Sequence, residues 1–222
     1  MVTATLSSRQ WRDLRWLVLA PHPDDETLGA GALIAQTAKA GRLAGLVYLT
    51  DGTGSHATAQ RLAAARRREA TRALQRLTGG QVRRPVHLDW KDATPARPGD
   101  PLFERTARYL AALCRRWRVD ALAVTARHEP HCDHAAAAAL AYAVHAQAMR
   151  NLLVAEYLVW ADRPDNHMRR VIQTAPMPAG QRRLALAAHR SQLTAAHGPG
   201  FRLSPDQRRM AAHDILYVRR RP

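Results

Sequence analysis

Two short segments of this sequence concentrate side chains that can bind a metal ion or transfer a proton. The first places His22, Asp24 and Asp25 in one tight stretch that two prolines interrupt. The second, residues 128–134, contains three histidines, a glutamate and an aspartate. A catalytic zinc ion usually takes three ligands from His, Asp, Glu or Cys and keeps one position for water. Together the two segments hold the parts needed for metal-assisted hydrolysis.

The spacing within the first segment suggests how these parts could divide their roles. His22 and Asp25 are three residues apart at the predicted start of a helix, so their side chains can converge on one ion. A third ligand must then come from elsewhere, and the segment His131–His134 supplies candidates. Asp24, which faces differently, is free to take a proton from a water molecule. His131 could donate to a developing oxyanion or to a leaving amine.

Strand-to-helix turns are expected to position both segments. The apolar runs 16–20 and 119–125 predict short buried strands, one directly before each cluster. Pro21 and Pro23 end the first strand, and a helix-compatible pattern runs from Glu26 to Ala40. In open α/β sheets, ligands bind at the carboxyl ends of the strands. The two strand ends therefore predict one composite site.

The rest of the chain continues to alternate between predicted strands and helices. Hydrophobic patterns predict further strands at 43–50, 86–88, 152–160 and 168–174, and helices at 60–77, 102–117, 133–149 and 180–194. Residues 92–101 are expected to form a loop, and the tail 198–222 carries one apolar patch at 215–218. This order predicts an α/β fold with a doubly wound, mostly parallel sheet, and we expect residues 1–222 to form a single domain.

The chain is strongly basic, with 34 Lys and Arg against 18 Asp and Glu and a formal net charge of +16. Such a charge favours an anionic partner. The arginines are scattered along most predicted helices, however, so we favour a solvated basic surface and do not expect nucleic acid as a partner. The helix 60–77 has both interpretations, because its arginines could be solvated or could steer an anionic substrate.

Cysteine usage and hydropathy indicate the compartment. Cys114 and Cys132 are the only cysteines, too few for a disulfide framework and consistent with a reducing interior. The sequence shows neither a signal peptide nor an apolar run long enough to span a membrane. We therefore expect a cytoplasmic protein with no membrane span. The oligomeric state is left open, a homo-oligomer included.

The same residues also allow simpler interpretations. Asp24 or Asp133 could be no more than the N-cap of a helix. Gly29 and Gly31 resemble part of a dinucleotide-binding loop, but Ile34 replaces its last glycine and the neighbouring carboxylates would repel a pyrophosphate. An iron site with two histidines and one carboxylate needs the same residue types, yet proteins that carry it are usually all-β. The pairing of two His and Asp clusters favours a metal-dependent hydrolase.

These two clusters also resemble a known family. The segment Ala20–Glu26 (APHPDDE) together with His131–His134 (HCDH) is similar to the two motifs of the LmbE/PIG-L family of zinc-dependent N-deacetylases. That family includes N-acetylglucosaminyl-phosphatidylinositol deacetylase and the deacetylases of mycothiol and bacillithiol synthesis. The resemblance extends over Leu17 to Thr194, where further similar residues are Thr50–Gly52, Arg66, Glu69 and His189–Gln192. It implies a Rossmann-like, three-layer α/β sandwich with one Zn²⁺ per chain.

The resemblance assigns roles to individual residues of the two motifs. It implies that His22, Asp25 and His134 are the zinc ligands. It makes Asp24 the general base, and His131 the group that stabilises the oxyanion or protonates the amine. These roles agree with the chemistry that the residue types allow.

Four other residues are implied as supports of the site or as substrate contacts. Asp133 would orient a histidine, Asp92 would match an aspartate that binds a substrate hydroxyl group, and Arg66 and His189 would lie near or beneath the metal. The sequence around Asp92 departs from the Gly- and Pro-flanked form common in the family. Cys132 stands where the family commonly has proline, and we expect little effect from this change.

The implied reaction is removal of an acetyl group from an N-acetylated amino-sugar conjugate of the N-acetylglucosamine type. The basic surface favours an anionic substrate. An amidase of the same fold that acts on a larger acyl group or a thiol conjugate would use identical chemistry. A basic nucleic-acid-binding protein with a structural metal is the alternative from another class, and its binding would depend steeply on salt. The motifs do not specify the aglycone, the acyl group or the native metal.

Overall fold

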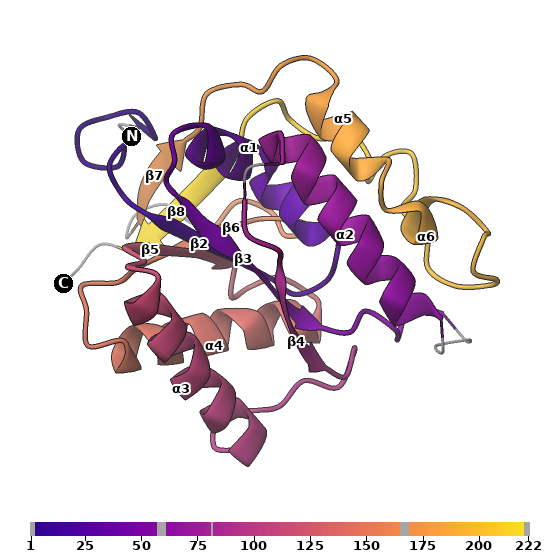
Figure 1. The fold of residues 1–222 in the computed structure, drawn as a ribbon, viewed down its shortest axis with the longest axis horizontal. Helices are drawn as coiled ribbons and strands as arrows, with labels where there is room; N and C mark the ends of the chain where they lie inside the picture. The colour runs from indigo at the N-terminus through magenta and orange to yellow at the C-terminus, as the bar shows by residue number, and fades with distance from the viewer. Residues whose placement is uncertain (1–2, 57–60, 81, 165–168, 220–222) are drawn as a thin grey trace.

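The computed structural model describes residues 3–56, 61–80, 82–164 and 169–219 (Figure 1). Within these ranges the chain forms one mixed sheet of eight strands and six helices. In chain order the elements are β1 (Ala4–Thr5), β2 (Trp16–Ala20), α1 (Asp25–Lys39), β3 (Leu43–Thr50), α2 (Leu62–Thr78), β4 (Val86–Trp90), α3 (Pro101–Arg116), β5 (Ala121–Thr125), α4 (Cys132–Gln147), β6 (Leu153–Tyr157), β7 (Arg169–Gln173), α5 (Gln181–Leu186), α6 (Arg190–Leu193) and β8 (Ile215–Arg219).

The strand order places the ends of β2 and β5 at the centre of the sheet. The order is β1-β7-β8-β6-β5-β2-β3-β4, and β8 alone among these strands runs antiparallel to its neighbours, β6 and β7. From β2 the chain adds β3 and β4 on one side and then returns to pair β5 with the other side of β2. The carboxyl ends of β2 and β5 therefore border a topological switch point, where α/β proteins bind ligands.

Helices cover both faces of the sheet, because the side chains of its central strands alternate between two cores. Trp16 and Val18 of β2 belong to a core that includes buried residues of α1, α2 and α5. Leu17 and Leu19 point to the opposite face and pack in a core with residues of α3 and α4. Figure 1 shows these two groups of helices on opposite sides of the strands. The parallel strands are buried on both faces, which explains their nearly uninterrupted apolar sequence.

Most predicted elements are confirmed, with small shifts at their ends. The strands predicted at 16–20 and 43–50 have those bounds, and the strand predicted at 86–88 continues to Trp90. The mostly parallel sheet is also confirmed. Two predicted first residues, Gln60 and Met168, lie outside the described residues.

Two predictions in the C-terminal part were wrong or incomplete. The single helix expected at 180–194 is two short helices, α5 and α6, because the backbone leaves helical geometry at His189 (φ −80°, ψ 60°). At this break the His189 ring reaches the buried carboxylate of Glu26, at 3.1 Å. The apolar patch 215–218 is part of strand β8, which the sequence analysis did not assign. Its antiparallel partners, β6 and β7, come from much earlier in the chain.

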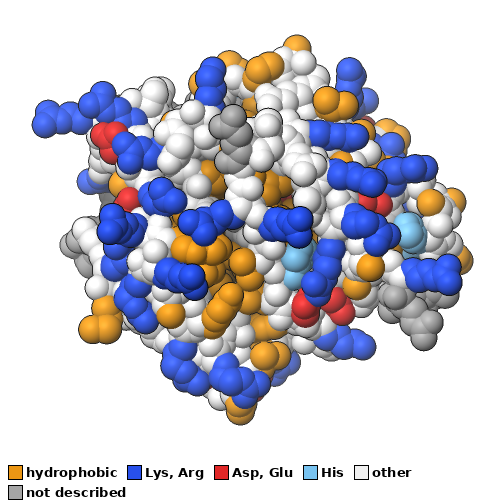
Figure 2. Space-filling view, in the orientation of Figure 1, with side chains coloured by type: hydrophobic (Ala, Val, Ile, Leu, Met, Phe, Trp, Pro, Cys, Tyr) orange, Lys and Arg blue, Asp and Glu red, His pale blue; other side chains and the backbone are white. Residues whose placement is uncertain are grey.

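Basic side chains are spread over the face of the molecule seen in Figure 2. Lysine and arginine atoms occupy many separate positions there, with apolar and uncharged surface between them. Some carry a partner, such as Arg67, whose guanidinium contacts Asp89 at 2.5 Å. In the described part of the chain, no helix combines the length and the apolar character that crossing a membrane requires.

Candidate active site

Asp24 occupies the junction between β2 and α1 in a strained backbone conformation. Its φ of 131° lies in a region that residues other than glycine rarely adopt. The Asp24 N–H donates to Glu26 Oε2 at 2.9 Å, and Glu26 Oε1 accepts from Thr27 Oγ1 and contacts His189 Nε2. A buried carboxylate network thus holds the turn in place. Such strain persists only where the surroundings over-determine it, as they do here.

The Asp24 side chain is free of the usual capping role. Asp24 is the N-cap residue of α1, yet its carboxylate makes no capping hydrogen bond. It lines a cavity and is only 5% exposed. Burial raises the pKa of Asp24 to about 7, although the guanidinium of Arg66, 3.8 Å from its carboxylate, opposes the shift. A carboxylate of this pKa is well placed to accept a proton near neutral pH.

The carboxylate of Asp25 brings the two sequence clusters into contact. Asp25 Oδ2 lies 3.0 Å from His22 Nδ1 and 3.2 Å from His134 Nε2. A tetrahedral metal with bonds of about 2.0 Å holds its ligand atoms about 3.3 Å apart, so these separations suit neighbouring ligands. Burial lowers the pKa of His134, but the negative charge of Asp25 outweighs this effect and raises it to about 9. The cluster therefore favours positive charge.

His134 has the hydrogen-bonding pattern expected of a metal-binding histidine. Its Nδ1 is 3.2 Å from Glu129 Oε2, an arrangement that places a proton on Nδ1, so that the lone pair of the neutral ring is on Nε2. Nε2 is buried, and no described residue forms a hydrogen bond with it, because the nearby Asp25 oxygen lies outside hydrogen-bond geometry. A buried nitrogen without a hydrogen bond is costly unless an ion or another group satisfies it. The residues therefore fit a metal.

His131 is placed differently from His134. It is the N-cap residue of α4, and its Nδ1 accepts from the Asp133 N–H at 3.2 Å. In the neutral ring this leaves the proton on Nε2. The His131 side chain is 39% exposed, whereas that of His134 is fully buried. This location also shows that Asp133 is not the N-cap of α4, contrary to the simpler interpretation of that residue.

More than one combination of ligand atoms is close enough to hold an ion. Ligand atoms of His22, His131 and His134 lie within 4.8 Å of one another, and so do those of His22, Asp92, His131 and Asp133. Asp25 belongs to neither group, although it contacts His22 and His134 individually. The structure thus brings all the predicted ligands into one cluster without selecting a set of three.

Asp133 and Asp92 both contact the far nitrogen of His22. His22 Nε2 lies 2.9 Å from Asp133 Oδ2 and 3.3 Å from Asp92 Oδ1. Asp133 is fully buried and also accepts from the Ala93 N–H. Burial alone would raise the pKa of Asp92, but its hydrogen bond and charge interaction with His22 hold that pKa at about 2. The two carboxylates hold the His22 ring in one orientation.

Arg66 ties the site to the loop after β3. Its guanidinium donates to the carbonyl oxygens of Pro23 and Gly52 and to Ser55 Oγ. Arg66 is nearly fully buried and lines the cavity. It therefore supports the turn that carries Asp24, and its guanidinium lies 3.8 Å from the Asp24 carboxylate.

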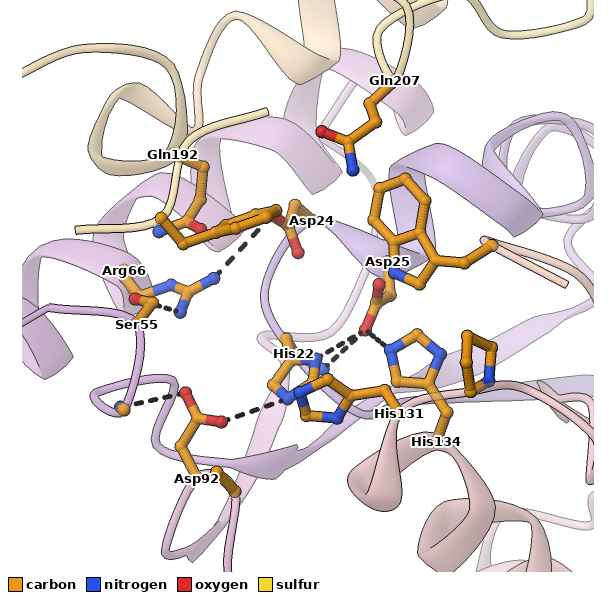
Figure 3. Close-up of a pocket in the computed structure, with 15 residues that line it drawn as sticks. His22, Asp24, Asp25, Ser55, Arg66, Asp92, His131, His134, Gln192 and Gln207 are labelled. Carbon is orange, nitrogen blue, oxygen red and sulfur yellow. Dashed lines mark hydrogen bonds and ion pairs between the residues drawn. The ribbon is translucent and has the colours of Figure 1, made fainter. Parts of the chain in front are cut away.

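The cavity above the cluster has a volume of about 500 Å³. In Figure 3, His22, Asp25, His131 and His134 gather at one end, whereas Gln192 and Gln207 lie on the side away from Asp92. The wall also includes side chains that the sequence analysis did not assign to the site or left undecided, namely Ser55, Pro130, Trp160, Gln192, Phe201 and Gln207.

Two residues of the segment His189–Gln192 lie in different places relative to the cavity. His189 is fully buried and bonded to Glu26, and it is not among the residues that line the cavity. Gln192, which the sequence analysis named only as part of the segment similar to the family, lines the cavity. The sequence analysis also missed Glu26 and Glu129 as functional candidates. Each lies close to a predicted site residue in the sequence, and this position was the available signal.

The fold and the site together define a class of protein. The chain is an α/β protein with a buried, metal-competent cluster of His and Asp at the carboxyl ends of two central parallel strands. Residues 17–145, more than half of the chain, match the PIG-L family, described as GlcNAc-PI de-N-acetylase. The chain therefore belongs to the PIG-L (LmbE-like) family.

Solved structures with similar folds include several deacetylases. N,N'-diacetylchitobiose deacetylase from Pyrococcus horikoshii matches with a TM-score of 0.63 and 22% identity, over 82% of this chain and 72% of that one. A conserved protein from Thermus thermophilus matches with a TM-score of 0.57 and 27% identity, over 84% and 82%. A deacetylase of the teicoplanin biosynthetic pathway has a TM-score of 0.65 and 21% identity, over 94% and 98%. No functionally curated protein matches the chain in sequence.

Proposed function

We propose that this protein is a zinc-dependent N-deacetylase that hydrolyses the acetamide of an N-acetylglucosamine-type conjugate. The observation that carries the proposal is the Asp24 carboxylate, which caps no helix and lines a cavity beside the His22, Asp25 and His134 cluster. Membership of the PIG-L family supports the same reaction. The deacetylases among the structures of similar fold agree with it.

We propose His22, Asp25 and His134 as the zinc ligands. Asp25 contacts the other two, and the Nε2 atom of His134 is buried without a hydrogen bond. His131 is the most exposed of the clustered histidines, which favours a position facing the substrate. Asp133 and Glu129 orient the rings of His22 and His134 from behind.

When bound, zinc would polarise the amide carbonyl group and make a water molecule more acidic. Asp24 accepts the proton of the attacking water as its oxygen bonds to the carbonyl carbon. His131 donates a hydrogen bond from Nε2 to the oxyanion that develops on the carbonyl oxygen. The proton held by Asp24 then passes to the nitrogen as the C–N bond breaks. The products are the free amine and acetic acid, which ionises to acetate by losing a proton to solvent.

The residues around Asp24 and the His and Asp cluster also have proposed roles. Asp92, which lines the cavity, would bind a substrate hydroxyl group, and Arg66 and His189 would hold the turn around Asp24. We also propose one domain over residues 1–222 with a Rossmann-like, three-layer arrangement, supported by the continuous sheet and its two cores. The free thiols of Cys114 and Cys132 support a cytoplasmic location.

The test is release of free amine from a panel of N-acetylglucosamine conjugates, before chelation, after chelation and after zinc is restored. We expect release that disappears with the chelator and returns with zinc. Absence of release from every conjugate by protein with stoichiometric zinc would contradict deacetylation. Equal turnover of neutral and phosphorylated derivatives would show that the substrate need not be anionic.

A further inference from the structure

A second cavity lies along helix α2, apart from the candidate active site. Its volume is about 440 Å³, and none of the residues that line it also lines the cavity beside the His and Asp cluster. One wall comes from α2, and the other comes from Gly80 and residues 82–85, which precede β4 (Figure 1). We call this cavity the arginine groove, and it is lined by Arg67, Arg68, Thr71, Arg72, Leu74, Gln75, Gly80, Val82, Arg83, Arg84 and Pro85.

The arginine groove concentrates positive charge that the chain itself neutralises only in part. Five of its eleven lining residues are arginines, and none is an aspartate or a glutamate. Among the residues that the structure describes, Arg68, Arg72 and Arg84 have no ion-pair partner. Arg68 and Arg72 are four positions apart on α2, so their like charges lie one helical turn apart and repel each other. An anion bound between them would relieve this repulsion.

The two other arginines of the groove are held by contacts of their own. The Arg67 guanidinium contacts Asp89 Oδ2 at 2.5 Å. The Arg83 guanidinium lies over the Trp117 ring, 5.2 Å from the ring centre. The ring attracts the cation but offers it no conventional hydrogen-bond acceptor, so the N–H groups of Arg83 stay available to a ligand. Because these two side chains are already positioned, ordering the groove around a ligand costs less conformational entropy.

Phosphate groups are the anions that match this lining best. A planar guanidinium can donate two parallel hydrogen bonds to the oxygens of one phosphate group. The groove offers such groups from both walls, with Arg68 and Arg72 on α2 and Arg83 and Arg84 on the facing segment. Two adjacent phosphates would let both walls bind one ligand.

The size of the groove and its uncharged residues indicate a small ligand. A volume of about 440 Å³ lies in the range of small-molecule sites. Leu74, Val82 and Pro85 supply apolar surface, and Thr71 and Gln75 supply neutral hydrogen-bonding groups. These residues suit an organic group attached to the phosphates. A nucleic acid would instead require basic contacts to many successive phosphates.

We propose that the arginine groove binds a small soluble molecule that carries a diphosphate group. The guanidinium groups bind the phosphate oxygens, and the uncharged residues of the groove contact the organic part of the ligand. This site is distinct from the candidate active site, and its ligand does not depend on the reaction proposed there.

Isothermal titration calorimetry with inorganic pyrophosphate and with ADP, at about 0.15 M NaCl, tests the proposal. We expect one bound ligand per chain with a Kd below about 1 mM. The double variant Arg68→Gln with Arg72→Gln should weaken binding about tenfold, because two charge-assisted contacts are lost. The matched control is Arg105→Gln with Arg108→Gln, which removes the same charge from exposed positions of α3 outside the groove and should leave Kd unchanged.

A variant that conserves charge separates a built site from diffuse attraction. Arg83→Lys keeps the positive charge but loses the planar fork, so we expect it to weaken pyrophosphate binding about threefold. An unchanged Kd in Arg83→Lys would contradict recognition by guanidinium groups. Equal weakening by the two double variants would also overturn the proposal, because it would show attraction to the net charge alone.

The His and Asp cluster could also attract phosphate oxygens through a bound metal. Pyrophosphate binding should therefore persist in His134→Ala, and in wild-type protein that is dialysed after treatment with EDTA. Loss of binding in both samples would place the anion at the cluster and overturn the arginine groove as its site.

Two further titrations test the source of the phosphate groups. The wild-type protein is mixed with single-stranded oligothymidylate and with vesicles that contain phosphatidylserine. We expect pyrophosphate and ADP to bind whether or not these larger anions do. Binding of either larger anion without binding of pyrophosphate or ADP would overturn a small soluble ligand, and so would no binding at all.

Discussion

Glu129 Oε2 lies 3.2 Å from His134 Nδ1, and both side chains are fully buried. The same carboxylate accepts the N–H groups of residues 159–161. One acidic residue therefore orients a proposed metal ligand and anchors the loop that carries Trp160. This relationship joins the His and Asp cluster to Trp160 in the wall of the cavity.

Glu129→Ala is expected to weaken zinc binding by about 10- to 100-fold, because His134 loses the partner that fixes its tautomer and ring orientation. Competition with a chromophoric chelator measures the zinc affinity. Glu104→Ala, at a half-buried site in the first turn of α3 that does not line the cavity, is a control for loss of a carboxylate. An unchanged affinity in Glu129→Ala would show that His134 is oriented by other contacts.

Asp24→Asn is expected to lower kcat by about 100- to 10,000-fold, because the amide cannot accept the proton of the attacking water. Its zinc content should stay at the wild-type level, since Asp24 is not among the proposed ligands. Asp25→Asn should instead lose zinc. Metal analysis beside single-turnover kinetics distinguishes the two outcomes, and near-normal turnover in Asp24→Asn would exclude it as the base.

Chelation is expected to lower the melting temperature, because an ion that binds the folded state alone stabilises it in proportion to the logarithm of its concentration over Kd. His134→Ala should already have the lower melting temperature and should respond little to the chelator. Differential scanning fluorimetry with and without EDTA gives both values. If EDTA removes all zinc from the wild-type protein and its melting temperature does not change, the result would contradict a metal site coupled to folding.

The two thiols are expected to differ in reactivity. Cys114 is fully buried, and burial raises the pKa of its thiol to about 12. Cys132 is exposed, while partial burial and the charge of Asp133 raise its pKa above the usual value. Because a raised pKa leaves less thiolate at neutral pH, labelling of Cys132 should be slow and should accelerate as the pH rises.

A thiol-reactive chromophore should therefore label one cysteine per native chain and two after unfolding. Cys132→Ser should abolish the native reaction. Equal labelling of both thiols in the native protein would contradict the packing of α3 against the sheet.

Gly29→Ala is expected to destabilise the protein by about 1–3 kcal/mol through overpacking. A Cβ atom at Gly29 would collide with the Tyr157 ring and would lie 2.7 Å from the Leu158 carbonyl oxygen. Gly31→Ala, on the same helix, would find Arg182 at 3.4 Å and should be neutral or gain up to about 1 kcal/mol in helix propensity. Urea denaturation measures the free energy of unfolding of both variants. Equal changes in Gly29→Ala and Gly31→Ala would contradict the close approach of α1 to β6.

The sequence predicted those features that depend on neighbours along the chain. The apolar run 16–20 and the prolines after it specify a strand and a turn, so His22 and Asp25 could be expected at a helix start. The second cluster follows β5 in the same way. Parallel strands expose their carboxyl ends at one edge, which made a composite site predictable before the strand order was known.

Other features could not be predicted because they join distant residues. The contact of His22 with Asp133 spans 111 positions, and the bridge of His56 with Gly200 depends on how the tail folds back. The sequence did not predict strand β8, because its apolar pattern is short. Its antiparallel partners, β6 and β7, become apparent only from the strand order of the sheet. Likewise, the backbone leaves helical geometry at His189, where the ring contacts the distant Glu26.

The sequence by itself thus determined which candidate residues lie in two local turns, because the geometry of each turn follows from the residues beside it. Tertiary structure alone decided that the Asp24 carboxylate is left without a capping bond, that Glu129 supports His134, and that Phe201 meets the cavity. Each of these depends on burial and on long-range packing, which a pattern of neighbouring residues does not encode.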